Sequence, residues 1–184
     1  NAALARAAAE ERRRRQLEEA ERIRLEAEAQ DLQKYRSEFF GRLRDVLGAQ
    51  EGVRVVGDRF VFSSEVLFAP GSAVLSGEGQ GEIAKVAAIL RGVLGDIPEG
   101  IDWVIRVDGH TDNVPLSGLG AFADNWELSQ ARALSVVRYM SGSLGIPPDR
   151  LSANGFGEYN PVNPANTEEA RAQNRRIELK FTEK

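Results

Sequence analysis

The first 47 residues contain no proline and are dominated by Ala, Glu, Arg and Leu, a composition typical of one long α-helix. Opposite charges recur four residues apart, as in Glu11 with Arg15 and Glu18 with Arg22, and each such pair stabilises a solvated helix by about 0.2–0.5 kcal/mol. The rest of the 184-residue chain has the length of one small domain. We therefore expect a helical linker over residues 1–48 and a single domain over residues 49–184.

Apolar residues recur at seven-residue spacing in the second half of this helix, at Leu25, Leu32, Phe39 and Val46. This spacing is that of a coiled-coil seam, which is one interpretation and would make the chain a homodimer. A single helix whose C-terminal end packs on its own domain would show the same pattern, so both interpretations stay open. Gly48 is the expected end of the helix.

From residue 53 the pattern changes to short strands and amphipathic helices. The segments "VRVV" and "RFVF" flank Gly57-Asp58, which predicts a β-hairpin. The further expected elements are a helix through Ile83 to Leu94, a strand over 101–107, a helix over 126–144, a strand over 151–153 and a final strand in "RRIELKFT". This order predicts an α+β domain with helices on one face of a small mixed sheet.

The second domain helix is expected to begin at Asn125 as its N-cap. Its expected inner residues are Leu128, Ala131, Leu134, Val137 and Met140. Near the C-terminus, Asn166 and Glu169 stand at the spacing of a capping box. These positions predict where the helices begin and which side of the longer one is buried.

Composition excludes several classes of function. A net charge of −4 is the opposite of what a nucleic-acid-binding protein carries, so no nucleic-acid partner is expected. The chain has no cysteine and one histidine, which leaves no disulfide and no zinc ligand set, and we expect neither a metal nor another cofactor. Because the chain begins at Asn1 without a signal-like or membrane-spanning segment, a membrane anchor is expected upstream of Asn1.

The segment from Asp108 to Arg132, "DGHTDNVPLSGLGAFADNWELSQAR", follows an alternating apolar strand and holds the only histidine. A hydrolase would pair His110 with a serine such as Ser117 or Ser129. Neither serine lies in a G-x-S-x-G turn, and a lone histidine at a strand end more often makes structural hydrogen bonds than transfers protons. We therefore expect no enzymatic activity.

Two opposite charges in this segment suggest a binding site instead. Asp112 lies just beyond the end of a strand, and Arg132 lies in the second turn of the following helix. If the loop between them folds back, a carboxylate and a guanidinium converge on one cavity, where they can hold the ammonium and the carboxylate of a zwitterion. Alternatively the two residues pair with each other at the surface, which contributes about 0–1 kcal/mol.

Motifs ordered along residues 53–184 resemble the OmpA-like peptidoglycan-binding domain family: "DGHTDN", "NWELSQARA" and "GFGEYNPVNPANTEEARAQNRRIEL". The long segment before "NWELS" and the earlier "VGDRFVFSSEVLFAPGSAVL" resemble the MotB-like branch. The resemblance implies a βαβαβ-type sandwich with a mixed sheet, and a domain without catalytic activity. It also implies the periplasm of a Gram-negative-type bacterium, with a tether to the inner membrane.

Matching these motifs residue by residue, the resemblance implies that Asp112 holds the ammonium and Arg132 the carboxylate of the free end of diaminopimelate in a peptidoglycan stem peptide. The residues expected to support this pocket are Thr111, Asn125, Leu128 and Arg176. The expected function is the anchoring of a membrane protein or complex to the cell wall. The alternative is a stator-type or coiled-coil assembly component that mainly dimerises, with weak or regulated wall binding.

Overall fold

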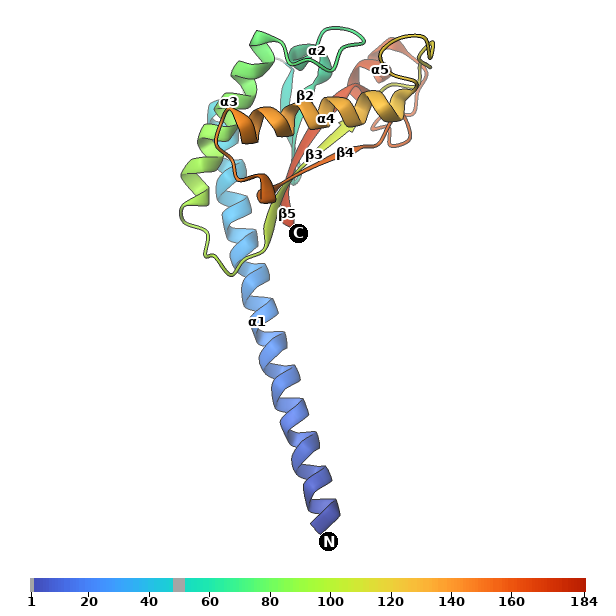
Figure 1. The fold of residues 1–184 in the computed structure, drawn as a ribbon. Helices are drawn as coiled ribbons and strands as arrows, with labels where there is room; N and C mark the ends of the chain where they lie inside the picture. The colour runs from blue at the N-terminus through green and yellow to red at the C-terminus, as the bar shows by residue number, and fades with distance from the viewer. Residues whose placement is uncertain (1, 48–51) are drawn as a thin grey trace.

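The computed structural model describes residues 2–47 and 52–184 and contains one mixed sheet with helices (Figure 1). The elements in chain order are α1 (Ala2–Leu47), β1 (Val53–Val56), β2 (Arg59–Ser63), α2 (Ser64–Leu67), α3 (Gly77–Leu94), β3 (Trp103–His110), α4 (Asn125–Gly142), the 3₁₀ helix η1 (Pro148–Arg150), β4 (Leu151–Gly155), α5 (Glu168–Asn174) and β5 (Arg176–Glu183). The α+β class, the mixed sheet and the long N-terminal helix are confirmed.

The five described strands lie in the order β1-β2-β5-β3-β4. The hairpin of β1 and β2 turns at Gly57, whose φ of 59° lies in the left-handed region that glycine adopts without strain. The last strand, β5, lies between β2 and β3 and runs antiparallel to both, whereas β4 runs parallel to β3. The crossover from β3 to β4 passes through α4, so this helix lies beside the ends of the two strands.

One face of the sheet is apolar and forms the core with α1, α3 and α4. Its residues on β3 and β5 alternate with polar ones, as a half-buried strand requires; the apolar set is Ile105, Val107, Ile177, Leu179 and Phe181. Phe39, Leu90 and Val136 bring one helix each into the same core. Figure 1 shows the C-terminal half of α1 beside α3, with α4 crossing in front of the strands.

The other face of the sheet is polar, and its charges pair along and across the strands. Arg106 on β3 lies 2.6 Å from the carboxylate of Asp108, which also accepts a hydrogen bond from Asn154 at 2.9 Å. Glu178 on β5 is buried and lies 2.9 Å from Arg59 on β2. Such pairing stabilises a sheet face that carries many charges.

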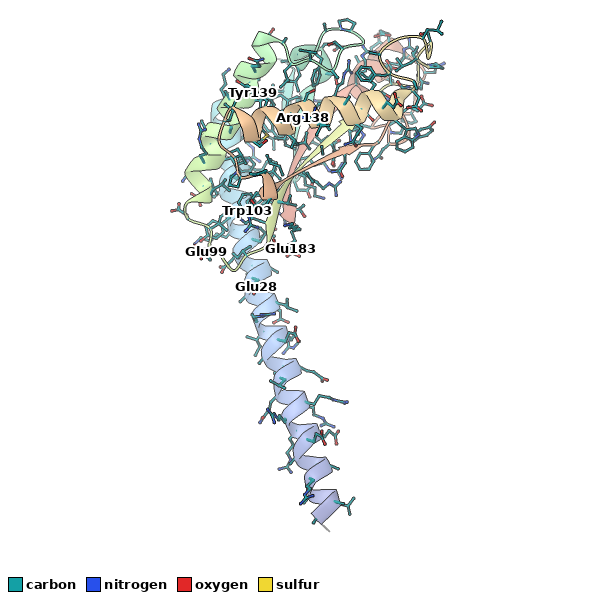
Figure 2. The ribbon with its side chains drawn as sticks, in the orientation of Figure 1. Glu28, Glu99, Trp103, Arg138, Tyr139 and Glu183 are labelled. Atoms are coloured by element: carbon teal, nitrogen blue, oxygen red, sulfur yellow. The ribbon has the colours of Figure 1, made fainter. Side chains whose placement is uncertain are left out.

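Helix α1 changes character along its length. Its first half has only exposed side chains, and Figure 2 shows them extending into solvent below the level of Glu28 and Glu183. In its second half, Phe39 lies edge-on to Phe181 of β5 at 5.9 Å between ring centroids. Leu32 is also buried in the domain core. The second half of α1 therefore packs on its own domain, which is one of the two interpretations of its apolar spacing.

This packing buries some residues of the expected dimer seam and leaves another exposed. Leu25 is 52% exposed, whereas Leu32 and Phe39 are buried within the chain itself. The side chain of Val46 and the expected helix end at Gly48 lie outside the described residues. No helix in the described part of the chain is both long enough and apolar enough to cross a membrane.

Two glycines let α4 pack directly on the sheet. Gly109 of β3 pairs with Gly155 of β4 in the parallel ladder. A Cβ on Gly109 would overlap the carbonyl oxygen of Ser129, and one on Gly155 would lie 2.5 Å from the backbone nitrogen of Gln130. Because no side chain separates the helix from the strands here, the first turns of α4 lie close to the loop that follows β3.

Candidate functional site

The loop after β3 begins with Thr111 and Asp112, which are held by backbone and side-chain hydrogen bonds. The Thr111 amide donates to the Gly157 carbonyl at 2.9 Å, and its hydroxyl donates to the Asp112 carbonyl at 2.9 Å. A carboxylate oxygen of Asp112 accepts from the Val114 amide at 3.0 Å. This Asx-type bond fixes the direction in which Asp112 leaves the strand.

Asn125 connects this loop to α4 rather than capping the helix. Its side-chain amide donates to the carbonyl oxygens of Asp112 and Val114 and to the Glu158 carboxylate at 2.9 Å. The N-cap is Asp124, which accepts from the Glu127 amide at 2.9 Å. The expected cap was thus wrong by one residue, because Asp and Asn are almost equally good caps and the local sequence does not separate them.

The buried side of α4 also differs from the expected one. The residues that are buried are Asn125, Leu128, Ser129, Arg132, Ala133, Val136 and Met140. Ala131, Leu134 and Val137, expected to be inside, are only partly buried. Polar side chains replace apolar ones in the first turns of the inner side because they face a cavity and a loop instead of the core.

Arg132 lies on that inner side and is only 5% exposed. Its Nε donates to the Ser72 carbonyl at 2.8 Å, and its guanidinium lies 5.2 Å from the centre of the Phe68 ring. The two terminal nitrogens make no hydrogen bond or ion pair with any described residue. Burial lowers the pKa of Arg132, while the nearby Asp112 carboxylate raises it; an arginine remains charged in such a setting.

A cavity of about 360 Å³ lies between the loop after β3, α2, the start of α4 and the C-terminal segment before β5. Of the residues expected from the sequence, five line it: Thr111, Asp112, Asn125, Leu128 and Arg132. The volume is within the range of small-molecule sites. Asp112 and Arg132 therefore face one hollow from two elements, and they do not form an ion pair with each other among the described contacts.

Arg175 also lines the cavity and was missed by the sequence reasoning. Its guanidinium lies 2.9 Å from the Asp112 carboxylate, 2.7 Å from Glu65 and 2.8 Å from Glu168. Burial opposes its charge, but the hydrogen bonds to these three carboxylates more than offset that effect and raise the pKa of Arg175. One guanidinium thus joins the loop, α2 and α5 around the cavity.

Arg176, the sixth residue expected in the pocket, does not line it. Its side chain is buried on the polar face of the sheet, where it donates to Glu178 at 2.7 Å and to the Asn160 carbonyl at 3.0 Å. The alternation of side chains along β5 could have distinguished Arg176 from Arg175. Arg176 shares a side with Glu178 in β5, and Arg175 precedes the strand.

His110 packs in the domain and takes no part in the cavity. The ring is 2% exposed and lies parallel to Phe156 with centroids 5.0 Å apart. Neither ring nitrogen has a hydrogen-bond partner among the described residues, so the expected structural hydrogen bonds are absent from the described contacts. Burial, reinforced by the nearby Arg176, lowers the pKa of His110 to about 4, and the imidazole is neutral at pH 7.

The serine–histidine pairing of a hydrolase is not formed in the described part of the chain. Ser129 donates to the Trp126 carbonyl at 3.0 Å and accepts from the Gly157 amide at 2.9 Å. Its hydroxyl therefore joins α4 to the loop after β4. Within residues 2–47 and 52–184, no group of His, Asp and Glu side chains has the arrangement of a metal site.

The fold and the cavity define the class of protein as an α+β domain with a cavity lined by charged side chains at one end of its sheet. The model of the OmpA family matches residues 67–175, more than half of the chain. The chain belongs to the OmpA family. It is an OmpA-like peptidoglycan-binding domain related to MotB and to cell-wall anchors, and this family is non-catalytic.

Curated relatives match parts of the chain. Motility protein B of Bacillus subtilis is 39% identical over 75 residues, which are 41% of this chain and 28% of that protein. Outer membrane protein A of Bordetella avium is 34% identical over 123 residues, 67% of this chain and 57% of that protein. The chain therefore spans between 28% and 57% of the length of these two relatives.

Solved structures match more of the fold. A MotB-like protein from Desulfovibrio vulgaris aligns with a TM-score of 0.68 and 32% identity, covering 86% of this chain and 96% of that one. The cell wall anchor of the T6SS from Pseudomonas aeruginosa aligns with a TM-score of 0.61 and 33% identity, covering 77% and 93%. The periplasmic domain of Helicobacter pylori MotB gives 0.60 and 26%, covering 73% and 83%.

Proposed function

We propose that the cavity holds the free zwitterionic end of diaminopimelate and that the domain thereby anchors a membrane protein or complex to the cell wall. The observation that carries this proposal is that Asp112 and Arg132 line one cavity from two different elements. Diaminopimelate ends in an ammonium and a carboxylate on the same carbon. A site with one acidic and one basic wall matches both groups at once.

The basic wall is a single guanidinium that is ready to bind. Arg132 is held by Ser72 through Nε and lies against Phe68, while its terminal nitrogens have no described partner. A planar guanidinium can donate two parallel hydrogen bonds to one carboxylate. Burial around the site strengthens such a bond, since water competes less for the charges.

The acidic wall carries more negative than positive charge. Asp112, Glu65 and Glu168 line the cavity together with Arg175. Glu168 also pairs with Arg171 at 3.1 Å, so three carboxylates face two guanidinium groups on this side. An arriving ammonium supplies the missing positive charge and donates hydrogen bonds that carboxylates accept. This excess favours a ligand with an ammonium over one with a carboxylate alone.

Binding of the chain to purified peptidoglycan and to the isolated stem tripeptide tests the proposal. We expect Asp112→Ala and Arg132→Ala to lose about 2–5 kcal/mol of binding free energy, because each leaves one ligand charge unpaired in a partly buried site. Arg138→Ala is the matched control, since Arg138 is an exposed arginine on the same helix and lies outside the cavity (Figure 2). If both site variants bind as well as the parent, the assignment is overturned.

A second ligand tests the basic wall of the cavity independently of the acidic wall. A stem peptide with lysine in place of diaminopimelate keeps the ammonium and lacks the carboxylate. We expect it to bind the parent more weakly than the diaminopimelate peptide, and we expect Arg132→Ala to bind the two peptides equally. Equal affinity of the parent for both peptides would remove Arg132 from the site.

We further propose a periplasmic location and a tether to the inner membrane. The related MotB domains are described as periplasmic. The exposed half of α1 extends from the end of the domain opposite the cavity (Figure 1), which suits a spacer between a membrane and the wall. Fractionation of cells expressing the complete open reading frame tests this, and recovery of the protein in the cytoplasm would contradict it.

A further inference from the structure

Two large aromatic side chains lie exposed beside the cavity. Trp126 in the first turn of α4 and Tyr159 in the loop after β4 stack with centroids 4.9 Å apart and an angle of 28° between the rings. They remain 49% and 64% exposed. An aromatic pair that keeps this much surface in water is a feature of binding sites, because most large aromatic rings bury more of their area.

The loop backbone holds the pair in place. Gly157 has a φ of 59°, and a Cβ at this position would lie 3.3 Å from the Tyr159 ring and 3.5 Å from the Trp126 ring. The amide of Gly157 donates to the buried Ser129 hydroxyl on α4. Gly157 therefore packs close to both rings and ties the loop to α4, and such ordering before binding lowers the entropic cost of holding a ligand.

The pair borders a hollow of about 200 Å³. This hollow shares two wall residues, Leu116 and Asn125, with the proposed diaminopimelate cavity. The two sites are therefore adjacent, with the Asn125 side chain between them.

Two carboxylates complete the wall of the hollow. Glu158 accepts from Asn125 through one oxygen, and Asp124 accepts from the Glu127 amide through one oxygen. The second oxygen of each makes no hydrogen bond with a described residue. Carboxylates only accept hydrogen bonds, so they select a ligand with hydroxyl or amide donors and repel one with negative charge.

We propose that Trp126 and Tyr159 form a subsite for a neutral sugar ring of the peptidoglycan glycan strand. A pyranose ring has an apolar C–H face that stacks on an aromatic ring and hydroxyl groups at its rim that donate to Glu158 and Asp124. The sugar to which a stem peptide is attached has its acid group consumed in the amide bond and is uncharged. The ligand chemistry thus fits both the rings and the carboxylates.

The reach of the stem peptide fits this position. Diaminopimelate is the third residue of the stem, and three extended residues span about 10 Å. This inference rests on the proposed diaminopimelate site, since the same molecule occupies both. With its zwitterionic end in the cavity, the stem carries its sugar to the adjacent hollow.

Calorimetry with two probes tests the subsite: the disaccharide tripeptide, and the tripeptide without sugars. We expect the parent to bind the disaccharide form about three- to tenfold more tightly, the range of one aromatic contact. Trp126→Ala and Tyr159→Ala should bind the disaccharide form only as well as the tripeptide, with tripeptide affinity unchanged. Trp126→Phe should keep part of the difference. Leu119→Ala, at a 93% exposed position outside the hollow, should keep all of it.

Tryptophan fluorescence provides a second measurement. Trp103 is buried and Trp126 is half exposed, so a change in emission on adding ligand reports mainly on Trp126. We expect the disaccharide form to shift the emission and the tripeptide to leave it almost unchanged. Equal shifts with both probes would contradict a sugar over this ring.

The outcomes separate the two proposals. If the parent binds both probes equally, or if the alanine variants lose both equally, the sugar subsite is overturned while the diaminopimelate site stands. If neither probe binds the parent, the diaminopimelate site fails and the subsite fails with it. If the parent is a dimer in solution and Trp126→Ala is a monomer, the aromatic pair belongs to an interface between copies, which also overturns the subsite.

Discussion

The guanidinium of Arg175 donates to the carboxylate of Asp112 at 2.9 Å. An arginine of the domain therefore already occupies part of the acidic wall that is proposed to receive the ligand ammonium. Because Arg175 also binds Glu65 and Glu168, it can shift its hydrogen bonds toward these two when a ligand approaches Asp112. Arg175 thus orients the Asp112 carboxylate before any ligand arrives.

Replacing Arg175 removes the residue that joins three elements around the cavity. We expect Arg175→Ala to lower the free energy of unfolding by about 1–3 kcal/mol, since three carboxylates lose a charged hydrogen-bond donor. Arg175→Lys should recover only part of this loss, because an ammonium lacks the planar fork of a guanidinium. Urea unfolding measures the effect, and stability equal to the parent in Arg175→Ala would show that the three contacts contribute nothing.

Adding a methyl group at Gly109 should separate α4 from the sheet. The new Cβ overlaps the Ser129 carbonyl, and overpacking of this kind costs about 1–3 kcal/mol. We expect Gly109→Ala to lower both the unfolding free energy and the affinity for the stem peptide, because Arg132 moves with the helix. Gly120→Ala is the control, since the space around Gly120 is open, and equal effects of the two changes would refute the close packing as the cause.

His110 should make the domain less stable in mild acid. Its pKa is about 4 in the folded chain and about 6.5 when unfolded, so the unfolded chain binds the proton more readily. The stability associated with the neutral ring is complete above about pH 6.5 and is lost as the pH falls toward 4, by about 2–3 kcal/mol. Urea unfolding between pH 7 and pH 4 measures this loss.

Other charged groups surround His110, and a variant isolates the contribution of the histidine. Asp108 and Glu178 face the ring from β3 and β5, with Arg176 and Arg59 beyond them. His110→Gln carries no titrating ring and should lose less stability than the parent between pH 7 and pH 4. The same loss of stability in both chains would show that His110 is not the cause of the pH dependence.

The two halves of α1 should differ in what they contribute to stability. A chain beginning at Leu25 lacks only exposed turns and should unfold within about 0.5 kcal/mol of the parent. Phe39→Ala should cost about 3–5 kcal/mol, because the ring is fully buried against Phe181. Leu17→Ala, at a 63% exposed position, is the control, and a cost similar to that of Phe39→Ala would contradict the packing.

The solution mass of the complete chain tests the remaining coiled-coil interpretation. Leu32 and Phe39, two of the expected seam residues, are buried within the chain, so we expect a monomer at micromolar concentration. Light scattering on the parent and on the chain beginning at Leu25 provides the comparison. A dimer that becomes a monomer after the truncation would assign self-association to the first half of α1.

Much of the fold could be predicted because its strands alternate strictly. Ile177, Leu179 and Phe181 against Glu178 and Lys180 locate β5 and its buried side from the sequence alone. The inner side of α4 could not be found in this way, because Ser129 and Arg132 are polar and yet buried. Their burial depends on a cavity formed by distant segments, which local periodicity does not contain.

Part of the lining of the cavity could also be predicted from local sequence. Asp112 and Arg132 lie in motifs that indicate their positions at a strand end and on a helix, and both line the cavity. Arg175 was missed because its role depends on Glu65 and Glu168, which lie 110 and 7 residues away along the chain. Only the folded chain brings these carboxylates to one guanidinium.

The arrangement of α1 also has a mechanical consequence. Strand β3 begins at Trp103, near the point where α1 leaves the domain, and ends next to Asp112 about 26 Å away. If the cavity holds the wall and α1 is pulled from its N-terminus, the contact between Phe39 and Phe181 carries part of the tension into β5. Because β5 is hydrogen-bonded to a neighbouring strand on both edges, this part of the load is shared by two ladders that are loaded in shear, so that many hydrogen bonds resist it together.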